Sequence, residues 1–259
     1  AQVQGWADIV HFHSPGFYDL KTPYLCTEHG QSAASTRHPR NTVYLSSAHA
    51  QNHGVKFFIY NGLDWQHLGR PDLSAKRDRF HFLGKTKTVK KNLSGAIALA
   101  ESAGESLHIM GNRWYESRPL NRHAYYGRVN DAQKAAVMRL SKGILSPVRW
   151  HEPFGLAMLE SLYYGAPIFG TPYGALPELV QSEKAGYLAT SIPDLLAAMK
   201  ETDHYDPIIC HEIASSFSAE NMTRSYMEAY NKVLDGESLQ AVEPTTNGDQ
   251  GLLLPQLTP

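Results

Sequence analysis

The chain has 259 residues, of which 42% are apolar and 10% aromatic, enough to form one large or two modest hydrophobic cores. Its 24 Lys and Arg residues nearly balance its 25 Asp and Glu residues, which argues against a nucleic-acid-binding or membrane-surface protein. The sequence shows no transmembrane run and no signal-peptide pattern, and its two cysteines lie far apart, so we expect a reduced, cytoplasmic protein.

Short apolar runs, which we interpret as strands, alternate with longer amphipathic stretches, which we interpret as helices. The predicted strands are Ala7–His13, Tyr24–Glu28, Thr42–Ser46, Lys56–Tyr60, Phe80–Gly84, Ser106–Met110, Ala124–Gly127, Gly143–Pro147, Pro167–Gly170 and Gly186–Ala189. The predicted helices are Asn92–Ala103, Asp131–Ser141, Gly155–Tyr164, Pro177–Ser182, Ile192–Met199, Pro207–Phe217 and Asn221–Leu234. From Phe80 onward strand and helix alternate, which is typical of an α/β fold with a parallel, doubly wound sheet.

The order of these elements predicts two domains. Residues 1–66 contain crowded strands with little helix between them, and the polar, turn-prone residues 67–79 are predicted to be a linker. Residues 80–218 form the second domain. A last helix in 219–236 is predicted to pack back on the first domain. The tail 237–259 is rich in Pro, Thr, Gln and Gly without periodicity, and we expect it to be poorly ordered.

The most informative segment is Ser146–Glu178. Pro153 suits the first turn of a helix, and Gly165 suits its C-terminal end. Between them the helix is almost entirely apolar, so it should be buried, and Glu160 is its only charge. An unpaired carboxylate there would cost several kcal/mol, so Glu160 needs a partner from the protein or from a ligand.

Glu152 lies just before this helix, eight residues ahead of Glu160. At about 1.5 Å rise per helical residue, the two carboxylates would be on the order of 12 Å apart, which suits two ends of an extended ligand better than a pair acting on one bond. The N–H groups around Phe154–Leu156 would face that ligand, and a helix N-terminus favours phosphate. Taken singly, each glutamate also has an ordinary structural interpretation as a residue bonded to backbone, arginine or helix dipole.

This run resembles the E-x7-E signature of the retaining glycosyltransferases of family 4, the group 1 glycosyltransferases, with the typical form W-x-E-P-F-G-L-x-x-L-E-A-x-A-x-G-x-P-V. The matching residues are Trp150, Glu152, Pro153, Phe154, Gly155, Leu156, Leu159, Glu160, Gly165 and Pro167, followed by Gly174, Pro177 and Glu178 of a G-G-x-P-E motif in which Ala175 replaces one glycine. The resemblance implies that Glu152 binds hydroxyls of the donor sugar and that Glu160 binds those of the ribose. It also implies that the backbone of Phe154, Gly155 and Leu156 meets the sugar and the diphosphate.

A second stretch, Phe82–Lys90, resembles the family's strand-end G-R-x-x-x-x-K, whose two cations hold the diphosphate. Breaking a sugar–phosphate bond leaves charge on the diphosphate, which fixed cations stabilise. Lys85 replaces the arginine and lacks its planar fork of donors. By position we assign the two cations to Lys85 and Lys90, with Lys87 or Lys91 as alternatives. A solvated, lysine-rich surface loop is the competing interpretation.

Two further matches complete the predicted donor domain. Leu107–Gly111 resembles the family's L-x-I-x-G strand, and Tyr126–Val129 resembles its G-x-V before a helix. The resemblance implies that the backbone of Arg128 and Val129 binds the base.

In the first domain, Asp8–His13 resembles D-x-V-H-x-H, Thr27–Gly30 resembles T-x-H-G, and Tyr60–Asp64 resembles the x-N-G-x-D that enters the family's linker. His29 aligns with a histidine that the family places near the reacting sugar, where it could donate a hydrogen bond. A neutral strand-end histidine is the competing interpretation, and His13 is the weaker candidate.

The resemblance implies a GT-B fold of two facing Rossmann-like domains with parallel sheets. The N-terminal domain is expected to be truncated, because the family's first strands and Gly-rich loop have no counterpart here. The implied activity is retaining transfer of a sugar from a nucleotide diphosphate sugar to an acceptor hydroxyl, in polysaccharide or glycoconjugate biosynthesis, with no cofactor and no metal. The leaving phosphate would deprotonate the acceptor on the same face. Four alternatives stay open: a fragment, a partner chain that completes the first domain, a non-catalytic nucleotide-sugar binding module, and a phosphorylase or epimerase on this fold.

Overall fold

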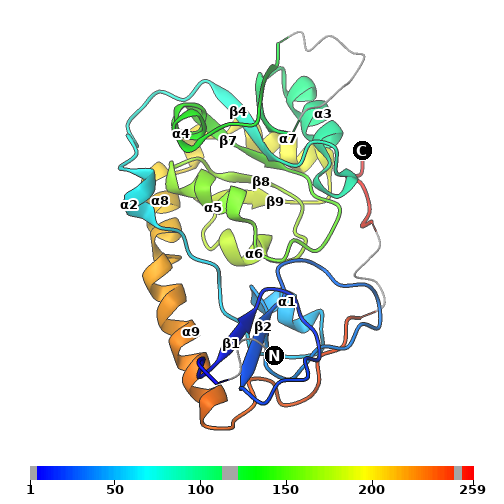
Figure 1. Ribbon diagram of the computed structural model, residues 1–259. Coiled ribbons are helices and arrows are strands. Elements are labelled where there is room, and N and C mark those ends of the chain that lie inside the picture. Colours follow the sequence, from blue (N-terminus) through cyan, green and yellow to red (C-terminus); the bar gives the residue numbers. More distant parts are fainter. Residues whose placement is uncertain (1–4, 113–121, 248–252) are drawn as a thin grey trace. The chain divides into compact units, whose positions relative to one another are not determined.

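The computed structural model describes residues 5–112, 122–247 and 253–259, which divide into two compact units (Figure 1). Unit 1 contains Ala1–Leu63, His151–Phe154 and Phe217–Leu252, and unit 2 contains Asp64–Trp150, Gly155–Ser216 and Leu253–Pro259. The division falls between Leu63 and Asp64, slightly before the end of the predicted first domain. The short segment His151–Phe154 groups with unit 1, although its sequence neighbours on both sides belong to unit 2.

Unit 1 is built on a three-stranded parallel sheet in the order β1 (Val10–Phe12), β2 (Tyr24–Thr27) and β3 (Thr42–Val43). Helix α1 (Ser47–Gln51) follows the sheet, and α9 (Ala219–Leu234) packs against β2, as the sequence predicts for the last helix. Their shared core consists of the buried apolar residues Leu25, Val43, Ile59, Ala229, Val233 and Leu239. The predicted strand Lys56–Tyr60 is wrong as a strand, because only one bridge, between Phe58 and Tyr44, is formed there.

The expectation of a poorly ordered tail is wrong for residues 237–247. Leu239 and Gln240 are buried, and the amide of Gln240 donates to the carbonyls of Thr42 and Phe57, at 2.8 Å each. Its Oε1 accepts from the Phe57 N–H at 3.1 Å. A single polar side chain thus satisfies backbone groups that no strand pairs, which composition could not reveal. Residues 248–252 lie outside the described residues.

Unit 2 contains a six-stranded parallel sheet, as the sequence predicts. Its strands are β4 (Arg79–Gly84), β5 (Leu107–Gly111), β6 (Ala124–Gly127), β7 (Ser141–Ser146), β8 (Ile168–Gly170) and β9 (Gly186–Leu188). Their spatial order is β6-β5-β4-β7-β8-β9. This is the doubly wound 3-2-1-4-5-6 order of dinucleotide-binding folds, with the topological switch point between β4 and β7.

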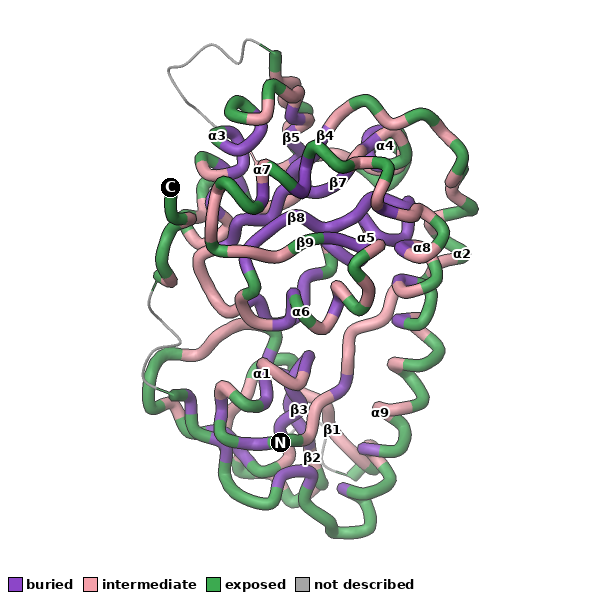
Figure 2. The backbone as a smooth tube through the Cα atoms, turned by 180° about the vertical axis from the view of Figure 1, so that it is seen from behind, coloured by how far each residue is buried: buried purple, intermediate pink, exposed green. Residues whose placement is uncertain are grey.

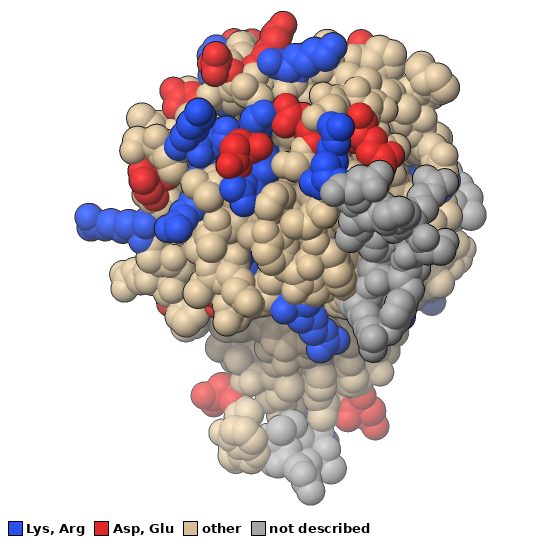
Figure 3. Space-filling view, turned by 90° about the horizontal axis from the view of Figure 1, so that it is seen from above, with Lys and Arg blue, Asp and Glu red and all other residues tan. Residues whose placement is uncertain are grey.

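Helices flank this sheet. They are α2 (Trp65–Leu68), α3 (Leu93–Ala103), α4 (Asp131–Met138), α5 (Leu156–Tyr163), α6 (Leu176–Leu179), α7 (Ile192–Lys200) and α8 (Pro207–Ser216), with short 3-10 turns at Val89–Lys91 and Thr202–His204. The central strands are buried, as Figure 2 shows for β4, β7 and β8, around a core that includes Phe80, Phe82, Leu107, Ile109 and Phe169. Basic and acidic side chains are interspersed on the face of unit 2 seen in Figure 3, as the near balance of charges leads one to expect.

Three local predictions need correction. Helix α4 ends at Met138, before the predicted Ser141, because Ser141 begins β7. Helix α5 begins at Leu156, so Pro153 lies ahead of the helix and not in its first turn. The predicted linker starts inside α2, whose Trp65 stacks on Tyr163 of α5 with ring centroids 4.3 Å apart. Gly165 ends α5 as predicted, with a φ of 74° directly after the C-cap.

Among the helices of the described residues, none combines the length and apolar character needed to cross a membrane.

Candidate functional site

The loops after β4 and β7 meet at the switch point of the unit 2 sheet. Strand β4 ends at Gly84 and leads into the lysine loop, defined here as Lys85–Lys91, and β7 ends at Ser146 and leads into Pro147–Trp150. The N–H of Arg149 donates to the carbonyl of Lys90 at 2.8 Å, which joins the two loops directly. Ligands of open α/β sheets bind outside the carboxyl ends of the strands at this point.

Short polar contacts fix the shape of the lysine loop. Thr86 is buried, and its hydroxyl donates to the carbonyl of Asn112 at 2.5 Å. Gly111 at the end of β5 leaves room for this contact, because a Cβ there would overlap the Gly84 carbonyl and lie 2.8 Å from Thr86 Cγ2. At the other end of the loop Asn92 adopts a left-handed conformation and donates to the Pro147 carbonyl at 2.8 Å. The loop is therefore tied to both neighbouring strands.

The lysines of this loop occupy different environments. Lys85 and Lys87 are exposed, whereas Lys90 and Lys91 are half-buried. The ammonium groups of Lys90 and Lys91 lie 5.4 and 5.0 Å from the centroid of the Trp150 ring, within cation–π range. The structure thus places the predicted cations Lys85 and Lys90 on the same loop, and it connects the second of them to the tryptophan of the E-x7-E segment.

Beside the lysine loop lies a pocket of about 460 Å³, at the carboxyl ends of β5 and β6. It is lined by Lys87, Asn112, Tyr125, Gly127 and Arg128. Two cations and an aromatic ring make it suited to an anionic ligand with a planar group. Of the predicted base-binding residues, Arg128 lines this pocket and is exposed, and Val129 follows it half-buried, just before the N-cap of α4.

Glu160 on α5 has a protein partner. Its Oε1 accepts from the ammonium of Lys134 on α4 at 2.5 Å, and Lys134 also contacts Asp131 at 2.9 Å. Both side chains of the Glu160–Lys134 pair are mostly buried, with 14% and 17% exposure. Among the described residues no group donates to Oε2 of Glu160. Lys134 was not predicted as a site residue, since no motif marks it; only the need of Glu160 for a partner pointed to such a residue.

The environment of this pair perturbs both groups. Burial raises the pKa of Glu160, while the ammonium of Lys134 acts in the opposite direction. Burial opposes the charge on Lys134, but the hydrogen bonds to Glu160 and Asp131 prevail and raise the pKa of Lys134. The pair therefore forms a partly desolvated charged site.

The residues around the start of α5 are divided between the units. Gly155, the N-cap residue of α5, has a φ of 104°, a conformation that favours glycine, and Leu156 begins the helix 43% exposed. No side chain of the described residues caps this helix start. Glu152 and Phe154 are buried in unit 1, where the Phe154 ring contacts Phe217, with centroids 5.7 Å apart.

His29 follows β2 in unit 1 and is exposed. Its Nε2 lies 2.9 Å from Nδ1 of His13, so one ring must donate and the other accept. His11 stacks on His13 with centroids 4.4 Å apart. Burial, with His13 as a second cause, lowers the pKa of His29. The two histidines that the sequence proposes, the stronger and the weaker candidate, are thus hydrogen-bonded to each other.

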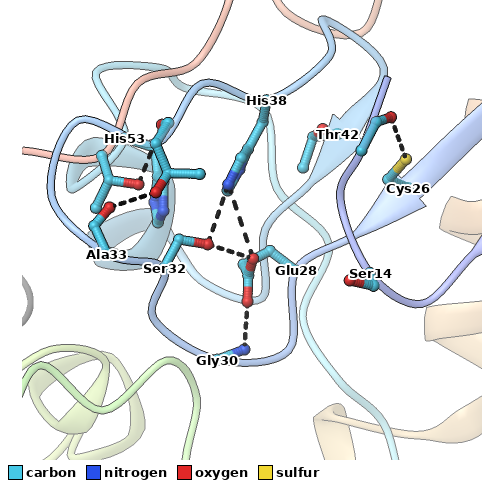
Figure 4. Close-up of polar contacts among 12 residues, drawn as sticks. Ser14, Cys26, Glu28, Gly30, Ser32, Ala33, His38, Thr42 and His53 are labelled. Carbon is cyan, nitrogen blue, oxygen red and sulfur yellow. Dashed lines mark hydrogen bonds and ion pairs between the residues drawn. The ribbon is translucent and has the colours of Figure 1, made fainter. Parts of the chain in front are cut away.

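A buried network supports the loop that carries His29 (Figure 4). Glu28 accepts from the Gly30 N–H and from the Ser32 hydroxyl, each at 2.8 Å. Ser32 also lies 3.0 Å from Nε2 of His38, whose Nδ1 lies 2.9 Å from the Tyr44 hydroxyl. Since the Ser32 proton is used on Glu28, His38 must donate from Nε2 and accept at Nδ1. The sequence did not predict this network, because Ser32, His38 and Tyr44 lie outside the T-x-H-G motif that contains Glu28 and Gly30.

Among the described residues no group of three or more His, Cys, Asp or Glu side chains is arranged to hold a metal ion.

Part of the chain is similar to a known protein family. The model of the family "Glycosyl transferases group 1" matches residues 79–199. No curated protein sequence matches the chain. Among solved structures, AviGT4, a glycosyltransferase involved in avilamycin A biosynthesis, is 23% identical with a TM-score of 0.69, over 88% of this chain and 75% of that one.

Two further structures share the fold. Sucrose-phosphate synthase from Thermosynechococcus elongatus is 14% identical with a TM-score of 0.69, over 85% of this chain and 70% of that one. HepE from Anabaena in complex with UDP-glucose is 15% identical with a TM-score of 0.66, over 82% and 73%. The fold is therefore the GT-B fold of these proteins, and residues 79–199 are similar to the group 1 glycosyltransferases.

Proposed function

We propose that this chain transfers a sugar from a nucleotide diphosphate sugar to an acceptor hydroxyl with retention of configuration. The observation that carries the proposal is the junction of the lysine loop with the β7 loop at the switch point, beside a pocket with two cations. HepE is an example of this fold in complex with a nucleotide sugar, UDP-glucose.

In this proposal the lysine loop binds the diphosphate. Lys85 is exposed and free to turn toward a ligand, and Lys90 is presented over Trp150 by the bonded loops. As the sugar–phosphate bond breaks, charge develops on the departing diphosphate, and these ammonium groups stabilise it without a cofactor or metal. The base then lies along Arg128 and Val129, next to the pocket that Lys87 shares.

Glu160 binds the ribose in this proposal. Its Oε1 is used by Lys134, which leaves Oε2 to accept from ribose hydroxyls. Lys134 holds the carboxylate in position, so an acceptor for a ribose hydroxyl is already in place.

Glu152 and His29 act on the sugar. Glu152 accepts from hydroxyls of the donor sugar, and His29, oriented by His13, donates a hydrogen bond near the reacting carbon. The bond between the anomeric carbon and the phosphate oxygen breaks, and a bond from that carbon to the acceptor oxygen forms on the same face. The acceptor proton moves to the departing diphosphate.

The test is a panel of UDP-, GDP- and ADP-sugars read first by thermal shift and then by product analysis. A ligand at 100 times its Kd adds about 2.7 kcal/mol to the free energy of unfolding, so one nucleotide class should stand out. With an acceptor present, NMR should show a new glycosidic bond with the anomeric configuration of the donor.

Other outcomes would replace the proposal. Turnover only with inorganic phosphate would indicate a phosphorylase, and conversion of the donor without an acceptor would indicate an epimerase. Binding without hydrolysis or transfer, across a broad acceptor panel, would indicate a nucleotide-sugar binding module.

A further inference from the structure

We infer that Arg149, held by the C-terminal segment Leu253–Pro259, is a positioning residue for the lysine loop. The inference rests on the proposed function, because it assigns that loop to the diphosphate. All residues involved belong to unit 2.

Arg149 is bonded on three sides. Its N–H donates to the Lys90 carbonyl at 2.8 Å, its carbonyl accepts from the Leu254 N–H at 2.9 Å, and its Nε donates to the Leu254 carbonyl at 2.9 Å. The side chain and the backbone carbonyl of Arg149 therefore both bind Leu254 of the C-terminal segment. The backbone N–H of Arg149 binds the end of the lysine loop.

The C-terminal segment is itself anchored at a second point. The Thr258 N–H donates to the Thr190 carbonyl and the Thr258 carbonyl accepts from Ile192, each at 2.8 Å. Leu257 packs against the core of unit 2, and the segment runs beside α3, as the red end of the chain in Figure 1 shows. Two fixed points four residues apart give the segment a defined course past Arg149.

The segment also faces the lysine loop. Gln256 and Arg149 line a small cavity of about 200 Å³ whose other walls come from the loop and the start of α3. These walls are Thr86, Lys87, Thr88, Val89, Asn92, Leu93 and Ser94. The segment and Arg149 thus lie against the loop, and its backbone is held before any ligand arrives.

This arrangement lowers the ordering cost of binding a diphosphate. A loop that is already fixed loses less conformational freedom when a ligand immobilises its lysines. Loosening the segment should therefore weaken the contact with the diphosphate but not the contacts with base and ribose. A general loss of folding would weaken all of them alike.

The experiment compares calorimetric affinities for the preferred nucleoside diphosphate and for its nucleoside in the full chain. Leu254→Pro removes the N–H that donates to Arg149, and Leu253→Pro is the matched control, because no described residue accepts from its N–H. We expect Leu254→Pro to lose about fivefold or more for the diphosphate and less than twofold for the nucleoside, with faster hydrogen exchange across Lys85–Asn92. Leu253→Pro should resemble the wild type.

Arg149→Lys separates positioning from charge. The variant keeps the positive charge but loses the donor at the Nε position, because the lysine ammonium lies one bond farther along the side chain. If Arg149 positions the loop, this variant should show the same selective loss, and it decides the question should Leu254→Pro not fold. Full diphosphate affinity in Arg149→Lys, or equal losses for both ligands, would overturn the inference. A wild-type chain that binds no nucleoside diphosphate would instead refute the proposed function.

Discussion

The polar side chains of unit 2 and unit 1 differ in their exposure to solvent. In unit 2 three basic side chains of the candidate site, Lys85, Lys87 and Arg128, project from loops at one edge of the sheet and are exposed. In unit 1 Glu28, His38 and their neighbours are buried and bonded to one another. An exposed cation keeps its hydration when the chain folds, so it adds little free-energy cost and stays accessible to an anion. A buried network fixes a loop, and the stability of that loop then depends on the protonation of its members.

From this difference we expect the two units to have different roles. Unit 2 should determine which nucleotide is held, and unit 1 should influence turnover through the residues near the sugar. Changes in unit 2 should therefore act on affinity, and changes in unit 1 on turnover and on the pH dependence of stability.

Glu152→Ala offers the largest expected effect. Because Glu152 is assigned to the sugar, turnover should fall about a hundredfold or more, the loss typical of a group that stabilises the transition state. Affinity for the nucleoside diphosphate should change less than twofold by calorimetry. A parallel loss of both quantities would mean that Glu152 only supports the segment around the start of α5.

Glu160→Gln should act on affinity. Replacing a charged acceptor by a neutral one costs about 1.5–3 kcal/mol, or roughly 10- to 100-fold in Kd for the nucleoside diphosphate. The variant also leaves Lys134 without its carboxylate, so Lys134→Met in the same background tests whether the loss comes from the ribose or from the broken pair. Glu212→Gln on the exposed face of α8 is the control. Unchanged affinity in a folded Glu160→Gln variant would remove this residue from the site.

Lys85→Ala should reduce the preference for diphosphate over nucleoside about five- to tenfold, as expected for one lost charge-assisted contact near the surface, and added salt should weaken what remains. Lys85→Arg should keep or improve the preference, and Lys200→Ala, on an exposed position of α7, should leave it unchanged. A silent Lys85→Ala together with a severe Lys87→Ala or Lys91→Ala would shift the assignment along the loop.

Acid should destabilise unit 1 through its buried histidines. Burial, with His53 as a second cause, lowers the pKa of His38 to about 4, and burial lowers the pKa of His49 to about 3. The unfolded chain takes up these protons near pH 6.5 and the folded chain does not, so stability is complete above pH 6.5 and is lost as the pH falls toward 4.

His38→Gln removes one of these protons and keeps a hydrogen-bonding group. The free energy of unfolding, measured by denaturant between pH 7.5 and 4.5, should fall less steeply in the variant than in the wild type. The two slopes should differ by up to about 1.4 kcal/mol per pH unit. Parallel curves for variant and wild type would show that His38 takes no part in the acid response.

The part of the fold that the sequence predicts is the part with strong local patterning. The alternation after Phe80 predicted the parallel sheet, and Gly165 marked the end of α5. Short elements such as α1 and α2 were missed, because four or five residues carry too little periodicity. Pro153 misled because proline fits the approach to a helix as well as its first turn.

For the site, the motifs marked residues that face a ligand but not the residues that hold them. Lys134 and Arg149 act through contacts made far along the chain, with Glu160 and Leu254. Such partners depend on tertiary packing, which spacing in one sequence does not encode.

The most direct test of the account is hydrogen exchange with and without saturating nucleoside diphosphate, chosen by the ligand panel. The account predicts slower exchange in Gly84–Asn92, Gly127–Asn130 and the start of α5, with the cavity lined by Leu73, Lys76 and Asp203 at the opposite edge of the sheet unaffected. Protection confined to that opposite edge, or no protection with any nucleotide at millimolar concentration, would contradict the assignment of the switch point as the donor site.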